Sequence, residues 1–397
     1  MLAGQPPIYL VTNRCKARVG FALIRAASLR LAWLALGWLL LALLAPSAHA
    51  APLVRVLLEE GLQRTVVEVA GPHEVRTVRG VARSGSGLAW PLSVNDGQLS
   101  SGAAAVGPWL ELHPADGVVV RDGSAYRGAL RVEAHEGAIR IVNLVDLESY
   151  LRGVVPSEMQ AIWPLEALKA QAVAARSYTL ASLDPSEPYD VCASDACQVY
   201  RGMAVEHPRS DQAVRETEGI VISWQGSPAV AYYHADSGGQ VASAAEVWGR
   251  DLPYLRARGD VAVASPHRGW TVRLDAARLA GALAAEGRAI GTPTTLTILA
   301  RSASGRAQEA RLDGTAGRTV LAGPALTRVL RGSGLKSTRI SSVGPLTVRG
   351  DGWGHGVGMS QYGARALALQ GYDYGRILAY YYPGVGLQRR IYRAEAR

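Results

Sequence analysis

The sequence contains little phenylalanine, little cysteine and few charged residues. Phe21 is its only phenylalanine among 397 residues, and Asp, Glu, Lys and Arg together make up 19%. Disordered and coiled-coil chains depend on a high density of charge, so neither can be the main content of this chain. Instead, 48% of the residues are hydrophobic and 44 are glycine, which predicts one large globular domain or two coupled ones.

A run of lysines and arginines is also missing. The formal charge is +9, but five of the 42 basic residues and none of the 33 acidic ones lie in the first fifty positions, which leaves +4 for the rest. Proteins that follow a phosphate backbone cluster their cations. We therefore expect no nucleic-acid partner.

The first fifty residues have the features of an export signal. Basic residues through Arg30 precede the apolar stretch 31–45, and small residues at Ala48 and Ala50 suit signal peptidase. As a helix the stretch spans about 22 Å, less than the ~30 Å hydrocarbon core, which favours cleavage over retention as an N-terminal anchor. Either outcome exports the protein to the periplasm, the cell wall or the medium, and the membrane is a partner only if the leader is retained.

The residue patterns predict an α+β fold. Short β-branched runs cut by turn residues over 52–142 predict antiparallel strands, and strands are also expected at 220–239 and 296–348. A helical segment is expected at 146–182. Shorter helices are expected at 274–286 and near the C-terminus.

The predicted helix ends follow from single residues. Asp146 is expected to cap the first helix, Pro156 to interrupt it, and Pro164 to begin the second helix. Ser360 is expected to cap the C-terminal helix, which Gly371 closes.

Glu158 lies in the expected break between the two helices, beside apolar residues such as Trp163. Apolar surroundings raise the pKa of a carboxyl group and keep a proton available near neutral pH, as a general acid requires. Alternatively, Glu158 caps the next helix or pairs with Lys169 or Arg176.

Glycine occupies every second position from Gly352 to Gly358, around Trp353 and His355. In an extended strand this pattern leaves one face without side chains, so a ligand or another backbone can approach closely. A phosphate-binding loop is disfavoured because no Gly-Lys-Ser/Thr follows. Close packing of strands is the structural alternative.

A polar loop combines His234, Asp236 and Ser237 with Gly238 and Gly239. Residues this close in the chain rarely form a catalytic triad, and the loop lacks a nucleophile elbow. We expect it to form hydrogen bonds with a substrate. The tyrosines that gather between 362 and 382, and the tryptophans at 163, 248, 270 and 353, suit stacking on sugar rings, although core packing is the default role for each.

Cys192 and Cys197 are the only cysteines beyond the leader. In an exported protein they can form a disulfide. A zinc site would need further ligands, and the candidates His207, His234, Asp195 and Glu187 have no diagnostic spacing. Disulfide, zinc site and free thiols therefore remain open at this point.

Taken together, these motifs resemble the stage II sporulation protein D family (SpoIID/LytB). The resemblance covers about 52–390, nearly all of the chain beyond the leader. The segments that carry it occur in the family's order and are 126–128, 142–159, 167–176, 197–200, 234–239, 247–255 and 353–364. We divide the chain into a leader (1–50), an N-terminal β-rich part (51–140) and a catalytic part (141–397), the last two forming one domain.

The resemblance implies a peptidoglycan lytic transglycosylase that cleaves peptide-free glycan strands in cell-wall remodelling or sporulation-type engulfment, with Glu158 as the catalytic acid. The residues expected to bind substrate are Arg176, His234, Ser237, Gly238, Gly239, His355, Ser360, Gln361 and Tyr362.

Some members of this family carry zinc near the Cys-Gln motif. Ala196 stands where a histidine is common, so we expect no required cofactor and keep zinc at Cys192 and Cys197 as an alternative. The family also implies a second function, that of a non-catalytic enhancer that binds peptidoglycan and assists a cell-wall amidase.

Overall fold

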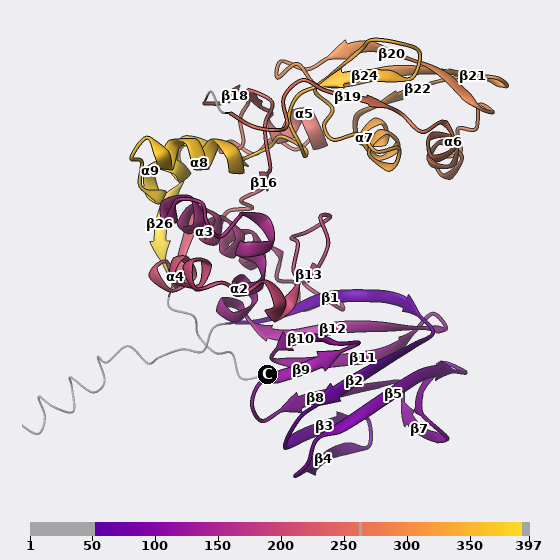
Figure 1. Cartoon of the computed structure of the whole chain (residues 1–397), viewed down its shortest axis with the longest axis vertical. Helices are drawn as coiled ribbons and strands as arrows, with labels where there is room; N and C mark the ends of the chain where they lie inside the picture. Colours follow the sequence, from indigo (N-terminus) through magenta and orange to yellow (C-terminus); the bar gives the residue numbers. More distant parts are fainter. Residues whose placement is uncertain (1–51, 262–263, 391–397) are drawn as a thin grey trace, which may run out of the picture. The chain divides into compact units, whose positions relative to one another are not determined.

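The computed structural model describes residues 52–261 and 264–390, so the predicted leader lies outside the described residues. The chain divides into two units, Met1–His49 and Ala50–Arg397. The second unit mixes helices with mainly antiparallel strands (Figure 1), which confirms the predicted α+β class. None of the helices among the described residues has the length and apolar character that a membrane crossing requires.

The N-terminal part forms two sheets that share one hydrophobic core. In the larger sheet, whose order is β13-β1-β12-β11-β8-β3-β4, only the short β1–β13 pairing is parallel. Its strands are β1 (Leu53–Leu62), β3 (His73–Thr77), β4 (Gly80–Ser84), β8 (Trp109–Pro114), β11 (Ala129–His135), β12 (Ala138–Asp146) and β13 (Val191–Cys192). The strands of the second sheet are β10 (Ser124–Arg127), β9 (Val118–Arg121), β2 (Arg64–Val69), β5 (Leu88–Asn95), β6 (Gln98–Ser101) and β7 (Ala104–Gly107).

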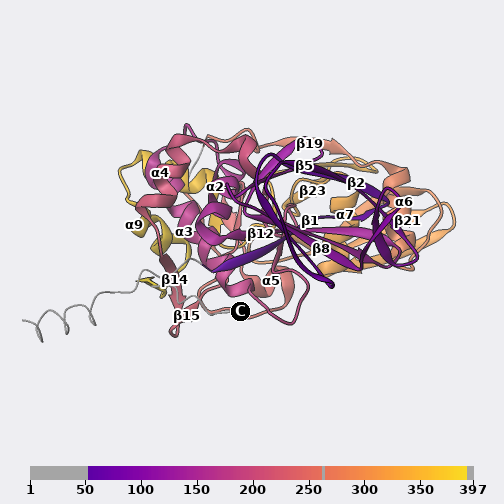
Figure 2. The same ribbon diagram turned by 90° about the horizontal axis from the view of Figure 1, so that it is seen from below.

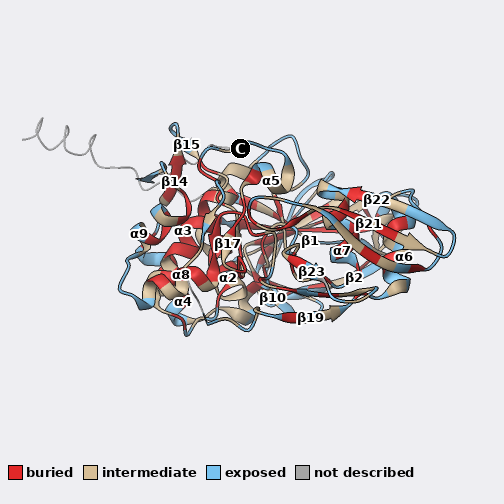
Figure 3. Cartoon of the chain, turned by 90° about the horizontal axis from the view of Figure 1, so that it is seen from above, coloured by how far each residue is buried: buried red, intermediate tan, exposed pale blue. Residues whose placement is uncertain are grey.

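Three helices pack beside this part: α2 (Leu147–Glu158), α3 (Leu165–Ser182) and α4 (Pro208–Glu216), which lie together in Figures 1 and 2. As predicted, the Asp146 carboxylate caps α2 by accepting a hydrogen bond from the Ser149 N–H at 3.0 Å. Buried residues dominate α3, and they run through its ribbon in Figure 3. Its several alanines allow this close packing on more than one side.

The prediction that Pro156 interrupts α2 is wrong. The helix continues to Glu158 and ends where Met159 adopts an extended conformation. A proline removes its own N–H from the helix and crowds the carbonyl four residues before it, but the turn after Pro156 keeps its hydrogen bond, because the Met159 N–H donates to the Val155 carbonyl at 2.9 Å. Glu158 is therefore the last residue of a helix rather than part of a longer break.

Short elements connect α3 to the C-terminus. They are a 3₁₀ turn (Gly202–Val205), β14 (Ile220–Trp224), β15 (Ser227–Pro228), β16 (Tyr233–His234), β17 (Gln240–Val241), α5 (Ala244–Trp248), β18 (Arg258–Gly259), β25 (Met359–Ser360), α8 (Gln361–Leu369), α9 (Tyr374–Tyr381) and β26 (Gly386–Arg389). The predicted cap of α8 is confirmed, because the Ser360 hydroxyl accepts a hydrogen bond from the Gly363 N–H. Parallel pairing of β16 with β25 joins the polar loop to the glycine-rich segment.

Residues 270–348 enclose a second hydrophobic core. Its elements are β19 (Trp270–Arg273), α6 (Ala276–Ala285), β20 (Pro293–Arg301), β21 (Ala307–Gly314), β22 (Gly317–Ala322), α7 (Gly323–Gly332), β23 (Ile340–Ser342) and β24 (Thr347–Gly350). Helix α6 was predicted, but α7 lies in a stretch predicted to hold strands. Leu326, Val329 and Leu330 are buried on one side of α7, and this helical spacing outweighs the surrounding turn residues.

Candidate functional site

A cleft of about 560 Å³ contains Glu158. Its walls come from the end of α2, the loop after β13, the segment around β16, helices α5 and α7, and the glycine-rich segment before β25. Of the residues predicted for the site, it is lined by Glu158, Cys197, His234, His355, Gln361 and Tyr362.

Both oxygens of the Glu158 carboxyl group are held. The Val199 N–H donates to Oε1 at 2.8 Å, and the Gln361 side-chain amide donates to Oε2 at 3.2 Å. Burial raises the pKa of Glu158, and these two donors oppose that shift by stabilising the ionised form. The result is a carboxyl group in a fixed orientation that retains its proton above the usual pH range.

Tyr233 connects Glu158 to a buried polar network. Its hydroxyl lies within hydrogen-bonding reach of Glu158 and donates to the Gln198 side-chain oxygen at 2.9 Å. The Gln198 amide in turn donates to Thr179 at 2.8 Å and to the Tyr150 hydroxyl at 3.3 Å. Residues of α2, α3 and the disulfide loop therefore fix the surroundings of one carboxyl group.

Two of the three histidines that line the cleft, His234 and His355, are neutral because burial lowers their pKa values. His355 donates from Nε2 to the Tyr233 carbonyl and accepts the Val357 N–H at Nδ1, and burial lowers its pKa to about 3. His234 donates from Nδ1 to the Val357 carbonyl at 3.0 Å, and burial lowers its pKa well below the usual value. Its Nε2 is buried and has no partner among the described residues.

Aromatic rings line the cleft in two clusters. In the first cluster the ring of Trp248 lies 4.5 Å from that of Tyr232 and 5.0 Å from that of His355. In the second cluster the rings of Trp163 and Tyr362 lie 4.9 Å apart, as do those of His267 and Trp353. Trp353 is 46% exposed. Trp270 lies outside the cleft, because it packs in the second core and donates to the Gly352 carbonyl.

The alternating glycines serve close backbone packing. Gly352, Gly354, Gly356 and Gly358 all have positive φ values, between 73° and 100°. The segment is therefore not the extended strand expected from its pattern, and only Met359–Ser360 pairs as a strand. Left-handed backbone of this kind favours glycine.

Neighbouring groups occupy the space that side chains would need at these glycines. A Cβ at Gly358 would collide with the Tyr232 carbonyl, and one at Gly356 with the Arg306 guanidinium. That guanidinium is buried and donates to the Ser237 carbonyl at 2.9 Å. The structural alternative for the glycine pattern is thus the one that the structure supports.

Cys192 and Cys197 form a disulfide, which decides among the three alternatives. Both sulfurs are used in this bond, and residues 52–261 and 264–390 contain no group of three or more His, Cys, Asp or Glu suited to a metal ion. The residues present therefore do not fit a zinc site. The disulfide closes the loop that carries Asp195 and leads into Val199.

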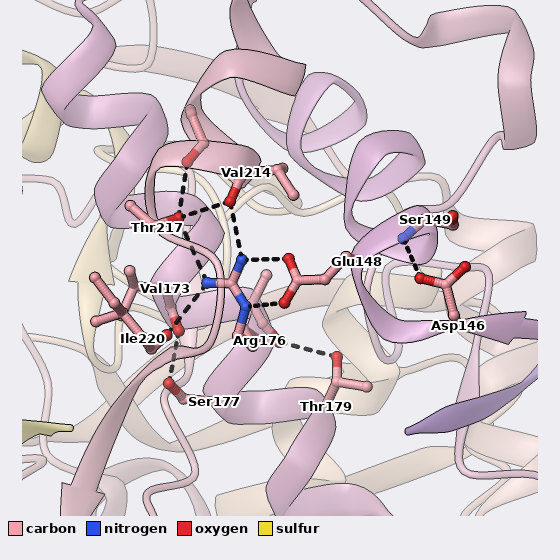
Figure 4. A network of polar contacts seen from close by, with 12 residues as sticks. Asp146, Glu148, Ser149, Val173, Arg176, Ser177, Thr179, Val214, Thr217 and Ile220 are labelled. Atoms are coloured by element: carbon pink, nitrogen blue, oxygen red, sulfur yellow. Dashed lines mark hydrogen bonds and ion pairs between the residues drawn. The ribbon is translucent and has the colours of Figure 1, made fainter. Parts of the chain in front are cut away.

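Arg176 does not reach the cleft. Its side chain is fully buried, and its guanidinium donates two hydrogen bonds to the Glu148 carboxylate, at 2.8 Å and 2.6 Å (Figure 4). It also donates to the carbonyls of Val214 and Ile220. A guanidinium engaged in this way joins α2, α3 and α4, so its position does not fit the expected contact with substrate.

Four other predicted residues build the loops rather than line the cleft. The Ser237 hydroxyl donates to Asp260 at 2.6 Å, and the Gly239 N–H donates to the Ser237 oxygen. The Gly238 N–H donates to Asp236 at 2.7 Å. Ser360 caps α8.

Three contributors to the site were not predicted in these roles. Val199 acts through its backbone N–H, which no side-chain pattern reveals. Tyr233 directly precedes His234 of the polar loop, and this position in the sequence is the signal that could have identified it as a site residue. Arg331 lines the cleft from α7 and pairs with Asp195, which lies 136 residues away in the chain, so no local pattern could connect the two.

Comparison with known proteins gives consistent matches. The family model described as stage II sporulation protein matches residues 135–224. The amidase enhancer of Bacillus subtilis is 32% identical over 288 residues, which are 60% of this chain and 40% of that protein, so the chain spans less than half of its length. An uncharacterized protein of Brachyspira hyodysenteriae is 30% identical over 84% of this chain and 92% of its own.

Stage II sporulation protein D of Bacillus amyloliquefaciens is 30% identical over 271 residues, which are 62% of this chain and 75% of that protein. Its aligned region extends well beyond the segment matched by the family model. The chain therefore belongs to the stage II sporulation protein D family.

Proposed function

We propose that the protein is a lytic transglycosylase that cleaves peptide-free glycan strands of peptidoglycan and leaves 1,6-anhydro-muramic acid ends. One observation carries the proposal: the Glu158 carboxyl group has a raised pKa and is held at both oxygens in a cleft with aromatic side walls. A general acid needs both the retained proton and the fixed orientation.

The reaction needs only this one carboxyl group. Protonated Glu158 donates its proton to the glycosidic oxygen as the bond between that oxygen and C1 of muramic acid breaks. The resulting carboxylate accepts the proton of the C6 hydroxyl, whose oxygen bonds to C1 and closes the 1,6-anhydro ring. Glu158 is thereby protonated again, and no water is consumed.

The neighbours of Glu158 assist both steps. The Val199 N–H and the Gln361 amide stabilise the carboxylate that exists between the two proton transfers. Trp248 and Trp353, which both line the cleft, offer flat apolar faces for sugar rings.

The test is digestion of purified peptide-free glycan strands by the wild-type protein and by Glu158→Gln, with mass spectrometry of the products. We expect anhydro-ended fragments from the wild type and at least ~100-fold slower release from the variant, because it lacks the acid. Glu218→Gln is the matched control, because Glu218 is exposed and forms no ion pair among the described residues. Equal activity of Glu158→Gln and wild type would contradict the proposal.

The similarity to a protein named amidase enhancer supports a second candidate. In that function the cleft binds glycan without cutting it and increases the activity of a cell-wall amidase. Digestion of intact peptidoglycan, with and without an added amidase, distinguishes the enhancer function from the transglycosylase function. Products that appear only with the amidase, and equally with Glu158→Gln, would favour the enhancer function.

A further inference from the structure

One ion pair connects two walls of the cleft. Arg331 on α7 and Asp195 in the disulfide loop both line the cleft, and Nη2 of Arg331 lies 2.8 Å from Oδ2 of Asp195. The Arg331 side chain is 49% exposed and that of Asp195 is 75% exposed. An ion pair this accessible to water contributes little to stability, so another carboxylate can replace Asp195 at small cost.

Most of the hydrogen-bonding capacity of Arg331 is unused. A guanidinium has five N–H donors and fits a carboxylate through two of them, whereas Arg331 makes one such contact within the described part of the chain. Its positive charge adds to the effect of burial in lowering the pKa of His355, and the negative charge of Asp195 adds to that of burial in raising the pKa of Glu158. Both charges therefore act at the centre of the cleft.

The proposed substrate carries the matching group. In a peptide-free strand each muramic acid has a free lactyl carboxylate, because the amide bond to its peptide has been hydrolysed. In a strand that keeps its peptides the same position is an uncharged amide. A cation beside the reacting sugar therefore distinguishes the two kinds of strand by charge as well as by size.

The cleft has room for such a strand along α7. A second hollow of about 440 Å³ continues from it past Trp248, and Pro324, Thr327 and Arg328 of α7 line it. Asp195 and Arg331 line both hollows. The ion pair thus lies at the junction of the two hollows.

We propose that Arg331 binds the lactyl carboxylate of a muramic acid residue and that this carboxylate replaces Asp195 as its partner. The inference rests on the proposed function, since it assigns the substrate group that the same cleft recognises. Arg331 is a specificity-determining residue in this scheme, and Asp195 is a competitor within the protein.

The test uses Arg331→Gln and Asp195→Asn with two substrates: peptide-free strands, and the same strands with the lactyl carboxylates converted to methylamides. On the carboxylate strands we expect Arg331→Gln to raise KM ~10-fold with kcat within a factor of two, as for the loss of one charge-assisted pair. We expect Asp195→Asn to lower KM there severalfold. On the amidated strands neither variant should change KM.

The two substitutions are expected to change KM in opposite directions, and this distinguishes substrate recognition from a purely structural ion pair between the cleft walls. If the ion pair only holds the walls together, both substitutions shift KM in the same direction on both substrates, and the proposal is wrong. Arg311→Gln is the matched control, because Arg311 also pairs with an aspartate, Asp313 at 3.0 Å, and does not line the cleft.

Binding measurements separate this inference from the proposed function. In the Glu158→Gln background, calorimetric titration gives the Kd for both strands without turnover. Tighter binding of carboxylate strands that disappears with Arg331→Gln supports the inference even if the wild-type protein releases no anhydro ends, which would overturn only the proposed activity. Equal Kd values for both strands would overturn the inference while leaving a measured cleavage intact.

Discussion

Two arginine–carboxylate pairs of this protein have the same chemistry and opposite surroundings. Arg176 and Glu148 form a two-point contact inside the helical part, and every guanidinium nitrogen of Arg176 has a protein acceptor. Arg331 and Asp195 form a single contact in an open cleft. Burial and the number of partners, not the identity of the residues, distinguish a structural pair from one that is available to a ligand.

The difference explains why sequence position misleads for Arg176. Its guanidinium links α2 and α3 to the carbonyls of Val214 and Ile220, so a substitution would impair activity through the fold. A residue required for activity need not touch the substrate. Four substitutions test this contrast, and we take them from the largest expected change in stability to the smallest.

Arg176→Ala should lower the free energy of unfolding by about 3–5 kcal/mol, because Glu148 would be left as an unpaired carboxylate against the helices. Urea denaturation followed by circular dichroism measures the change. Arg176→Lys keeps the charge but loses the planar fork, so it should recover only part of the loss. A stable, well-folded Arg176→Ala protein with reduced substrate affinity would instead indicate a direct contact with substrate.

Replacing both Cys192 and Cys197 with serine should lower stability by about 2 kcal/mol, because a disulfide closing so short a loop restricts the unfolded chain only moderately. The loop carries Asp195 and leads to the Val199 N–H that holds Glu158. Activity should therefore fall together with stability. Melting curves with and without reductant provide the measurement, and the serine variant should no longer respond to reductant.

Local patterns predicted much of the fold. The caps at Asp146 and Ser360 and the strands of the β-rich part follow from single residues and from alternation. Helix α7 was not predicted, because its buried leucines and valine lie among glycine and threonine residues that are typical of turns. Pro156 was also misleading, since one missing N–H near a helix end does not stop the helix.

The candidate site was predictable where its chemistry lies in side chains of motifs that stand out in the sequence. Glu158, His234, His355, Gln361 and Tyr362 come from three such motifs and meet in the cleft. The sequence could not reveal features that depend on contacts between distant segments. These are the hydrogen bond from the Val199 N–H, the pairing of Arg331 with Asp195, and the burial of Arg176.

Unlike Glu148 and Asp195, Glu158 has no cation at ion-pair distance among the described residues. Its pKa is raised in the folded protein, so between about 4.3, the usual value for glutamate, and the raised value the folded protein binds more protons than the unfolded chain. Stability is therefore lost as the pH rises through this window. Glu158→Gln should remove the loss and raise the free energy of unfolding at pH 7 above that of the wild type, while the difference from wild type should shrink as the pH falls toward 4. If Glu158→Gln and the wild type were equally stable at pH 7 as well as near pH 4, the raised pKa of Glu158 would be contradicted.

Arg331→Gln should change the free energy of unfolding least, by less than about 0.5 kcal/mol, because its ion pair is open to water. The same substitution should have a large effect on the binding of carboxylate strands, and that effect should shrink as salt is raised from 50 mM to 500 mM, since screening weakens an exposed charge contact. Urea denaturation and salt-dependent titration on one preparation measure both. A loss of stability approaching that of Arg176→Ala would mean that the cleft pair is structural after all, and the contrast between the two arginines would disappear.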